Sequence, residues 1–478
     1  MPATTPSQTR TVRGTVVRFS VLAALYVAIV HLLPRPAAVS PEGWRLVGIF
    51  VATVGGLILQ PIPGGALVLM AITLASVGGG LSLAEALAGY SDPTVWLVMA
   101  AFFISRSLID TGLARRIALG FVRMFGKSTL GIAYSLSLSD MVLASIIPSN
   151  AARSGGVILP ILRSIAELYG SLPGPSAALI GSFLFTAVYQ GICVTAAMFF
   201  TGQASNPLAA QSAGQYGQTV TWSSWLLAGI VPGLVSLAAI PPLMLKINPP
   251  QIRRTPEAAA FAASQLREMG PMKRGEWILA AVFAAVCGLW ATSGVHKIDI
   301  TVTALFGSAV LLVTGVLKWE EVKSERAAWD IFIWYGGLLR LGKALNDTGA
   351  TTEFAKAVGG AFANFGWVAL FAAALAIYYY AHYGFASITA HILAMYPAFL
   401  AVLLAKGAPA GLVVYSFACF TNLAAGLTNY GTTPSPMFYA HEYVSFRCWW
   451  KAGFLISFVN LAIWSTAGFA WWKLIGLW

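Results

Sequence analysis

Two stretches of polar and small residues interrupt apolar runs of this chain: Ile147-Pro148-Ser149-Asn150-Ala151-Ala152-Arg153-Ser154-Gly155-Gly156 and Gly384-Phe385-Ala386-Ser387-Ile388-Thr389-Ala390-His391. Each is followed further along the chain by a second polar break, first Thr201-Gly202-Gln203-Ala204-Ser205-Asn206-Pro207 and then Thr428-Asn429-Tyr430-Gly431-Thr432-Thr433-Pro434-Ser435-Pro436. Non-helical backbone is tolerated at membrane depth only where it is buried in protein or lines a wet cavity. Matching interruptions in two halves of a chain therefore predict an inverted repeat with a binding site between the breaks.

The composition is that of a polytopic membrane protein. The 478 residues are 58% hydrophobic and 10% charged, with a mean hydropathy of +0.75, whereas soluble domains carry about 25% charged residues. The net charge of +12 comes from basic residues in short loops between apolar runs, which is typical of membrane topology, so nucleic acid is not an expected partner. The sequence has no P-loop, HExxH or GxSxG motif, which leaves an intramembrane enzyme as a remote alternative.

Apolar runs predict the membrane-spanning helices. Ordinary spans are expected near 17–34, 44–60, 64–80, 94–113, 224–245, 276–294, 299–317, 329–345 and 453–475. Residues about 129–168 and about 365–403 are predicted to form re-entrant hairpins, and two ordinary spans per pair are the alternative. Broken helices are predicted at about 176–217 and about 410–442. The fold class is therefore an all-α polytopic membrane protein with inverted repeats, two re-entrant hairpins and two broken helices.

The distribution of basic residues predicts the orientation. With the amino terminus in the cytoplasm, cytoplasmic segments hold most basic residues: Arg10, Arg13, Arg18, Arg115, Arg116, Arg123, Lys127, Lys246, Arg253, Arg254, Arg267, Lys273, Arg274, Lys318, Lys323, Arg326, Arg447 and Lys451. External loops then hold few, and the asymmetry persists only if the two hairpins enter from opposite sides of the cytoplasmic (inner) membrane. The carboxyl terminus is thus expected outside. Residues 19–33 also resemble a signal-peptide core, and cleavage would remove residues 1–38 without changing the remaining orientation.

The breaks supply groups that suit an anionic substrate. Their hydroxyl and amide side chains are Ser149, Asn150, Ser205, Asn206, Ser387, Thr389, Thr432 and Thr433. A helix that begins at a break also presents free N–H groups and a partial positive charge, which bind carboxylate or phosphate. An isolated Ser or Thr more often bonds back to its own helix. Clusters at matching places in two halves instead predict a substrate site.

Ionisable residues at membrane depth are functional candidates. Arg153 follows the first break and is expected to pair with a substrate carboxylate, to pair with Asp140 in the preceding arm, or to serve as a cytoplasmic-side anchor. His391 follows the second break and is expected to contact substrate, as a donor or a positive group, or to be a satisfied buried histidine. His382 is a weaker candidate. Gln190 is expected to make an inter-helix hydrogen bond.

These motifs resemble the paired hairpin tips and partner loops of the divalent-anion:sodium symporter family. The resemblance rests on Ser149-Asn150-Ala151, Ser387-Ile388-Thr389, Gly202-Gln203-Ala204-Ser205-Asn206 and Gly431-Thr432-Thr433-Pro434. It covers nearly the whole chain and is closest to the exchanger branch of 2-oxoglutarate/malate translocators and citrate/succinate or tartrate/succinate antiporters. It implies a homodimeric elevator transporter whose small di- or tricarboxylate substrate is held by both tips and both loops. Ala151, Ile388 and Pro434 thereby join the predicted substrate-binding set.

The resemblance also implies a division into scaffold and transport parts. The first repeat would comprise scaffold helices at 1–113, transport-domain elements at 114–222 and a scaffold-side helix at 223–247, followed by a cytoplasmic linker at 248–275. The second repeat would comprise scaffold helices at 276–346, transport-domain elements at 347–452 and a C-terminal transmembrane helix at 453–478.

Sodium is the one coupling ion that the resemblance implies, and no other cofactor is expected. The family's first sodium site would use Ser145, Ser149, Asn150 and Gly202. Its second site expects a hydroxyl near position 383 and an asparagine at 388, where this chain has Tyr383 and Ile388. An isoleucine side chain has no oxygen for a hard cation. Carboxylate exchange is therefore the first hypothesis, and sodium-coupled symport of the same acids is the second.

Overall fold

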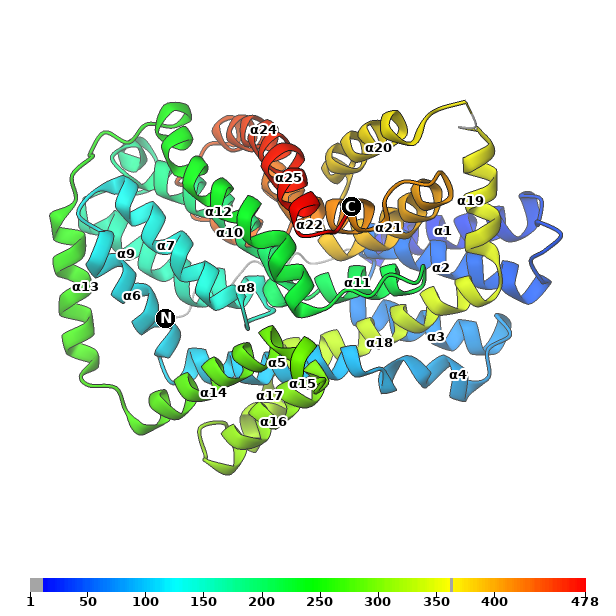
Figure 1. Cartoon of the computed structure of the whole chain (residues 1–478), viewed down its shortest axis with the longest axis horizontal. Helices are drawn as coiled ribbons and strands as arrows, with labels where there is room; N and C mark the ends of the chain where they lie inside the picture. The colour runs from blue at the N-terminus through cyan, green and yellow to red at the C-terminus, as the bar shows by residue number, and fades with distance from the viewer. Residues whose placement is uncertain (1–11, 362–363) are drawn as a thin grey trace. The chain divides into compact units, whose positions relative to one another are not determined.

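The computed structural model describes residues 12–361 and 364–478, and its regular structure is helical, with one isolated β-bridge between Ser128 and Arg254 (Figure 1). The predicted fold class is confirmed at this level. Arg10 and residues 362–363 of the predicted second transport segment lie outside the described residues. Of the described chain, residues up to Val95 and Asp330–Ala361 form one compact unit, and Trp96–Trp329 with the residues from 364 to Trp478 form the other.

The first unit contains helices from both ends of its sequence range. Its elements are α1 (Val12–Val27), η1 (Ala28–Leu32), α2 (Pro41–Leu59), α3 (Gly64–Gly78), α4 (Leu83–Leu87), η2 (Ala88–Ser91), most of α18 (Arg326–Asp347) and α19 (Ala350–Ala361). A Cβ at Gly89 would lie 1.9 Å from the carbonyl oxygen of Gly336, so glycine at this position lets η2 approach α18. The Arg340 Nε donates to the Glu85 carbonyl at 2.7 Å, which joins α18 to α4 as well.

The first half of the second unit contains the predicted first hairpin and the first broken helix. Its first elements are α5 (Pro93–Asp110), α6 (Leu113–Phe125), α7 (Thr129–Ala144), α8 (Asn150–Arg153), η3 (Ser154–Ile158), α9 (Leu159–Leu168), η4 (Pro175–Ala178), α10 (Gly181–Met198), η5 (Phe200–Gly202), α11 (Asn206–Gly214) and α12 (Trp222–Ile247). Almost every residue of α10 is buried. This helix packs against α7, α12 and α22 and forms the core around which the breaks are arranged.

The rest of the second unit repeats this pattern. Its elements are α13 (Pro256–Met269), α14 (Arg274–Ala291), α15 (Ser293–His296), α16 (Ile300–Val313), α17 (Trp319–Ser324), α20 (Trp367–Ala381), η6 (His382–Gly384), α21 (Ile388–Ala405), α22 (Ala410–Ala424), η7 (Ala425–Leu427), α23 (Pro434–Tyr439), α24 (Phe446–Ile463), η8 (Trp464–Gly468) and α25 (Phe469–Leu474). Like α10, α22 is buried along nearly its whole length. The two broken helices are thus the most enclosed parts of the fold.

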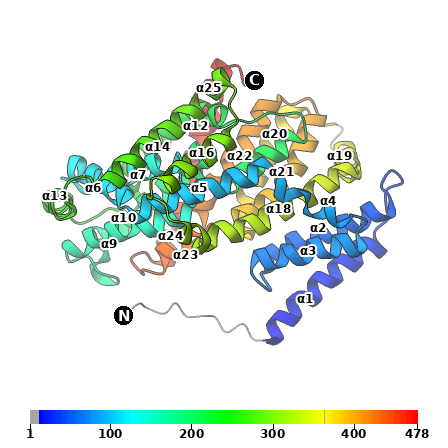
Figure 2. The ribbon, with the colours of Figure 1, turned by 90° about the horizontal axis from the view of Figure 1, so that it is seen from below.

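The polar linker at 248–275 is packed against the protein. Its helix α13 spans Pro256–Met269 and lies beside α6 (Figures 1 and 2). The Arg116 guanidinium reaches across to Glu276 (Nε to Oε1, 2.7 Å) and to the Gly270 carbonyl. The Tyr169 hydroxyl donates to Glu257 at 2.7 Å, and this bond holds the pKa of the Glu257 carboxyl below its usual value. These long-range polar contacts fix the linker in place.

Nine helices within the described residues are long and apolar enough to cross a membrane. Three of the spans predicted from the sequence are not among these nine helices. The helices α3 and α16 are apolar but shorter, and α18 is not among the nine because Asp330, Arg340 and Lys343 interrupt its apolar character. Conversely, α21, predicted as a short hairpin arm, is an 18-residue helix and is among the nine. Helix length alone therefore does not distinguish a re-entrant arm from a crossing at α21.

We expect Gly453→Leu to destabilise the protein. A Cβ at Gly453 in α24 would lie 2.4 Å from the carbonyl oxygen of Gly426, so a larger side chain forces α24 away from the second broken helix, at a cost of about 1–3 kcal/mol. The measurement is the melting temperature of detergent-purified protein. Gly288→Leu is the matched control, because a Cβ at Gly288 meets nothing within 4 Å. Equal melting temperatures for the two variants would contradict this close packing.

Candidate functional site

The interruptions have the same local construction in both halves. In the first, Ser149 caps α8 by accepting from the Ala152 N–H at 3.1 Å, and in the second, Ser387 caps α21 by accepting from the Ala390 N–H at 3.4 Å. Each later break is a 3₁₀ turn followed by a short helix with proline in its first turn, at Pro207 in α11 and at Pro434 in α23. The polar tips are thus helix starts, as the sequence suggested.

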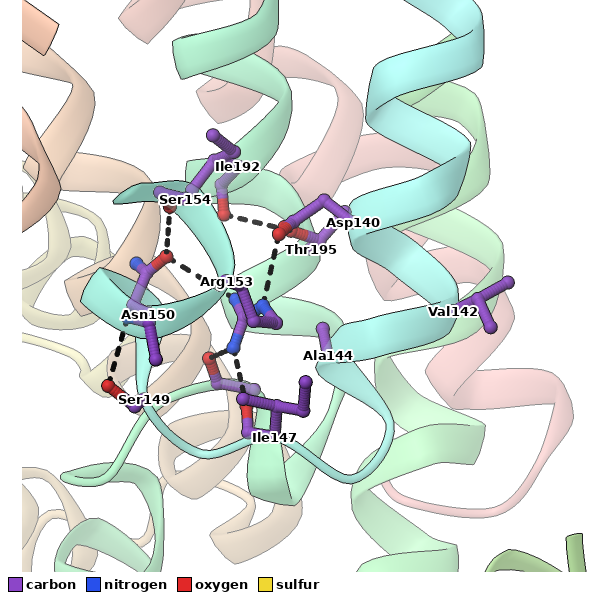
Figure 3. A network of polar contacts seen from close by, with 12 residues as sticks. Asp140, Val142, Ala144, Ile147, Ser149, Asn150, Arg153, Ser154, Ile192 and Thr195 are labelled. Atoms are coloured by element: carbon purple, nitrogen blue, oxygen red, sulfur yellow. Dashed lines mark hydrogen bonds and ion pairs between the residues drawn. The ribbon is translucent and has the colours of Figure 1, made fainter. Parts of the chain in front are cut away.

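Arg153 lies at the centre of the first cluster and is completely buried (Figure 3). Its Nε donates to Asp140 Oδ1 at 3.0 Å, and one terminal nitrogen donates to the Ile147 and Gly202 carbonyls at 2.6 and 2.8 Å. The other terminal nitrogen contacts Asn150 Oδ1 at 3.4 Å. Of the roles considered for Arg153, the pairing with Asp140 is present in this geometry. Arg153 also contacts Asn150, which is itself predicted to bind substrate.

The same network extends into the first broken helix. The second carboxylate oxygen of Asp140 accepts a hydrogen bond from the Thr195 hydroxyl in α10, and Ser154 donates to Asn150 Oδ1 at 3.2 Å. The negative charge of Asp140 compensates that of Arg153 inside a fully buried cluster. The Asn150 amide is therefore held by its oxygen, which leaves its nitrogen to face another partner (Figure 3).

Two of the four predicted sodium ligands contact the Arg153 guanidinium in this arrangement. The Gly202 carbonyl and the Asn150 amide oxygen both accept from the Arg153 guanidinium. The Ser145 hydroxyl donates to the Val142 carbonyl at 2.7 Å, and the Ser149 hydroxyl caps α8. A sodium ion needs several free oxygen atoms and gains nothing from a neighbouring positive charge. The guanidinium thus engages two of the four predicted ligands, whereas the Ser145 and Ser149 hydroxyl oxygens keep lone pairs.

Each broken helix donates hydrogen bonds to the interruption of the other. From α10, the Tyr189 hydroxyl donates to the Ala425 carbonyl at 2.8 Å, and Gln190 Nε2 donates to the Gly426 carbonyl at 2.9 Å. From α22, Asn422 Nδ2 donates to Asn206 Oδ1 at 2.8 Å. The inter-helix role expected for Gln190 is confirmed. Each helix thus satisfies polar groups that the other's interruption exposes.

The second hairpin tip is tied to the second loop. His382 Nε2 donates to the Gly431 carbonyl at 2.9 Å, and the Tyr430 hydroxyl donates to the Tyr383 carbonyl at 2.9 Å. The short helices complete the arrangement, since α11 packs against α21 and α23 packs against η3. All four interruptions predicted from the sequence therefore belong to one connected cluster inside the second unit.

Buried polar atoms without a hydrogen-bond partner are concentrated in this cluster. Four of the predicted site residues carry such an atom: Asn150 Nδ2, Ser205 Oγ, His391 Nε2 and Thr432 Oγ1. Most buried polar groups in proteins are hydrogen-bonded, because leaving one unpaired costs about 1–3 kcal/mol. So many unpaired atoms from both halves, and from both hairpins and both loops, indicate a polar ligand that completes their bonding.

The remaining predicted residues differ in their exposure. Ala151, Ser387 and Thr389 are half-buried, Ile388 and Pro434 are buried, and Thr433 is exposed. Asn206 is an internal brace, since its amide nitrogen donates to the Ala196 and Phe199 carbonyls.

Sequence reasoning missed two residues of the cluster. Thr428 Oγ1 and Asn422 Oδ1 are also buried and unpaired. The signal for Asn422 was present, because a lone amide inside the apolar run of α22 requires a partner in the interior. For Thr428 the sequence showed only a position at the edge of a polar break, which many residues share.

Comparison with known proteins places the chain in a family. Residues 15–478 match the family described as "Sodium:sulfate symporter transmembrane region". The chain belongs to this family. It is 44% identical over 452 residues to YflS of Bacillus subtilis strain 168, whose name proposes malate transport, covering 94% of this chain and 95% of that protein. This chain is thus a membrane transporter and not an enzyme.

Further relatives and a solved structure agree with this assignment. The chain is 41% identical over 456 residues to the chloroplastic dicarboxylate transporter 1 of Arabidopsis thaliana, covering 94% of this chain and 82% of that protein. The crystal structure of the Alcanivorax borkumensis YdaH transporter matches 97% of this chain and 98% of that one, with a TM-score of 0.52 and 13% identity. At that identity the likeness concerns the fold alone.

We expect Asp140→Asn to unfold or strongly destabilise the protein. The substitution leaves the buried Arg153 guanidinium without a compensating charge, which costs about 3–5 kcal/mol for a buried pair. Thermal unfolding of purified protein measures the loss. The control is Glu167→Gln, which breaks an exposed ion pair with Arg163 and should leave the melting temperature unchanged. A normal melting temperature for Asp140→Asn would show that Arg153 does not depend on this carboxylate.

Proposed function

We propose that this transporter exchanges di- or tricarboxylates of the C4–C6 class across the cytoplasmic membrane. The proposal is supported by the names of relatives that span nearly the whole chain, which refer to malate and dicarboxylates. It is also supported by the buried, unpaired polar atoms in both halves of the connected cluster, since two groups of donors suit an acid with carboxylates at both ends.

The observation that favours exchange over sodium symport is the position of Arg153. Its guanidinium is fully buried and bonded to two of the oxygens in the sodium-ligand set. The guanidinium therefore competes with a sodium ion for these ligands, while Asp140 compensates its charge. On this proposal the acid is transported without a coupled cation. Sodium-coupled symport of the same acids is the second candidate. It is favoured by the half-buried Ser145 and Ser149 hydroxyls, whose oxygens could bind a sodium ion.

Each substrate carboxylate would be bound by neutral donors. Asn150 Nδ2, Ser205 Oγ and Thr432 Oγ1 are buried and free to donate, and the α21 helix start adds backbone N–H groups beside Ser387 and Thr389. A hydrogen bond to a charged group contributes about 1.5–3 kcal/mol. Several of them bind the acid without burying further charge.

We further propose that the transport elements move as an elevator within a homodimer, with the hairpins re-entering from opposite faces. The empty site carries helix starts and unpaired donors that are costly to move through the lipid, and a bound acid satisfies them. Substrate can shift the inward–outward equilibrium only through such a difference in interaction between the two states. An exchanger results if the empty carrier rarely crosses. The amino terminus is proposed to be cytoplasmic and the carboxyl terminus external.

Uptake by proteoliposomes tests exchange against symport. We expect uptake of radiolabelled malate to require dicarboxylate inside the vesicles and to proceed equally in sodium and potassium buffers. Vesicles loaded with chloride are the control for counter-substrate, and protein-free vesicles are the control for leakage. Uptake that needs external sodium and ignores internal acid would establish the symport alternative.

Loss of single donors tests the site. Asn150→Ala and Thr432→Val should each weaken carboxylate binding and exchange by about 10–100-fold, because each removes a buried donor to a charged oxygen. Thr314→Val is the matched control, since the Thr314 hydroxyl is exposed and bonds only its own helix. Folded variants with wild-type exchange would exclude these donors from the site.

A further inference from the structure

His382 and His391 form a buried imidazole pair at the second hairpin tip. Their Nδ1 atoms are 2.9 Å apart, and His382 Nε2 lies 2.9 Å from the Gly431 carbonyl oxygen. The His391 ring is stacked on Phe385 with centroids 4.9 Å apart, and its centroid is 4.3 Å from that of Tyr378. His391 Nε2 is buried without a partner. Both rings are thus fixed by their contacts, and only the Nε2 atom of His391 lacks a hydrogen-bond partner among the described residues.

The chain of contacts determines which nitrogen atoms carry protons. A carbonyl oxygen only accepts, so His382 Nε2 must carry the hydrogen that it shares with Gly431. In a neutral His382 the Nδ1 atom is then an acceptor, and His391 Nδ1 must donate to it. In a neutral His391 the remaining Nε2 therefore has a bare lone pair and can only accept a hydrogen bond.

The surroundings favour the neutral form of both rings. Within the described residues, the two rings contact aromatic rings, each other, the Gly431 carbonyl and the Tyr378 backbone, and neither histidine forms an ion pair. A buried positive charge without a carboxylate nearby is costly. This differs from Arg153, whose charge is compensated by Asp140. The second hairpin thus presents a hydrogen-bond acceptor where the first presents the amide nitrogen of Asn150.

We propose that His391 Nε2 accepts a hydrogen bond from the hydroxyl group of a 2-hydroxy di- or tricarboxylate, with His382 as the positioning residue that sets its tautomer. The inference rests on the proposed function and names the substrate class more narrowly. A carboxylate cannot donate to Nε2, whereas the hydroxyl of malate, tartrate or citrate can. The Gly431 carbonyl, which orients the pair, directly precedes Thr432, whose hydroxyl is also buried and unpaired. The imidazole pair is thus linked through Gly431 to the loop that carries Thr432.

The physical consequence is discrimination by a single hydroxyl. A site built around a buried acceptor penalises an analogue without the donor, because the acceptor then stays unpaired. Succinate and L-malate differ only in this hydroxyl. 2-Methylsuccinate is about as large as malate and has no donor, so it separates hydrogen bonding from the filling of space.

Binding to the purified full-length protein, measured by isothermal titration in detergent, tests the inference. The wild type should bind L-malate about tenfold more tightly than succinate or 2-methylsuccinate. His391→Phe keeps an aromatic ring between Tyr378 and Phe385 but removes the acceptor. It should weaken malate binding about tenfold and change succinate binding less than about threefold. His391→Gln restores an acceptor and should recover part of the preference. His31→Gln, at an exposed histidine, is the matched control.

His382→Phe tests the positioning role. It frees His391 to take either tautomer, so the malate-to-succinate ratio of affinities should fall while succinate binding persists, an effect that simple loss of stability would not produce. The inference is overturned if the wild type does not prefer malate over 2-methylsuccinate, or if His391→Phe weakens both acids equally, as expected for a protonated ring bound to a carboxylate. A wild type that binds none of the acids would instead refute the proposed function. The wild-type comparison remains decisive if a variant fails to fold.

Discussion

The buried ion pair between Arg153 and Asp140 is the interaction on which the site depends. It joins the arm before the first tip to the helix after it, and through the Gly202 carbonyl it joins both to the first broken helix. Because the pair is fully buried, neither charge can be removed alone without a large cost. The pair contributes no net charge, but it fixes the guanidinium beside the Ile147 and Gly202 carbonyls and the Asn150 amide oxygen, which leaves the buried Asn150 amide nitrogen unpaired.

A second constraint acts on the backbone. A helix that is broken in the interior exposes carbonyl and N–H groups that water cannot reach, and each must find a partner in the protein. Here the partners come from the other half of the chain, since Tyr189 and Gln190 bind the carbonyls of the second break and Asn422 binds Asn206 of the first. The two interruptions are therefore mutually dependent. A site shared between halves follows from this exchange of partners.

The two hairpins use different chemistry around similar frames. The first places a compensated cation behind a tip of neutral donors, and the second places a pair of imidazoles behind its tip. This difference breaks the symmetry of the repeat. An acid with a carboxylate at each end and a hydroxyl near one of them is itself asymmetric, and the proposed orientation of His391 Nε2 would define which end faces which hairpin.

The amino-acid sequence by itself determined the class of protein, the number and place of the interruptions and most residues of the cluster. These features are local, because apolar runs, polar breaks and the proline after each loop are patterns of consecutive residues. The low fraction of charged residues also leaves few alternatives to a membrane protein. Asn150, Ser205, His391 and Thr432 were predicted in this way, and all carry buried unpaired atoms.

Only the tertiary structure decided what each polar group does. The sequence left Arg153 between a substrate and Asp140, and the distances across the cluster assigned it to Asp140 and to the Gly202 carbonyl. It could not show that Thr195 supports Asp140, that the linker packs on α6 or that His382 orients His391. Hydrogen bonds between residues far apart in the chain depend on distances of a few tenths of an ångström, which periodicity and composition do not encode.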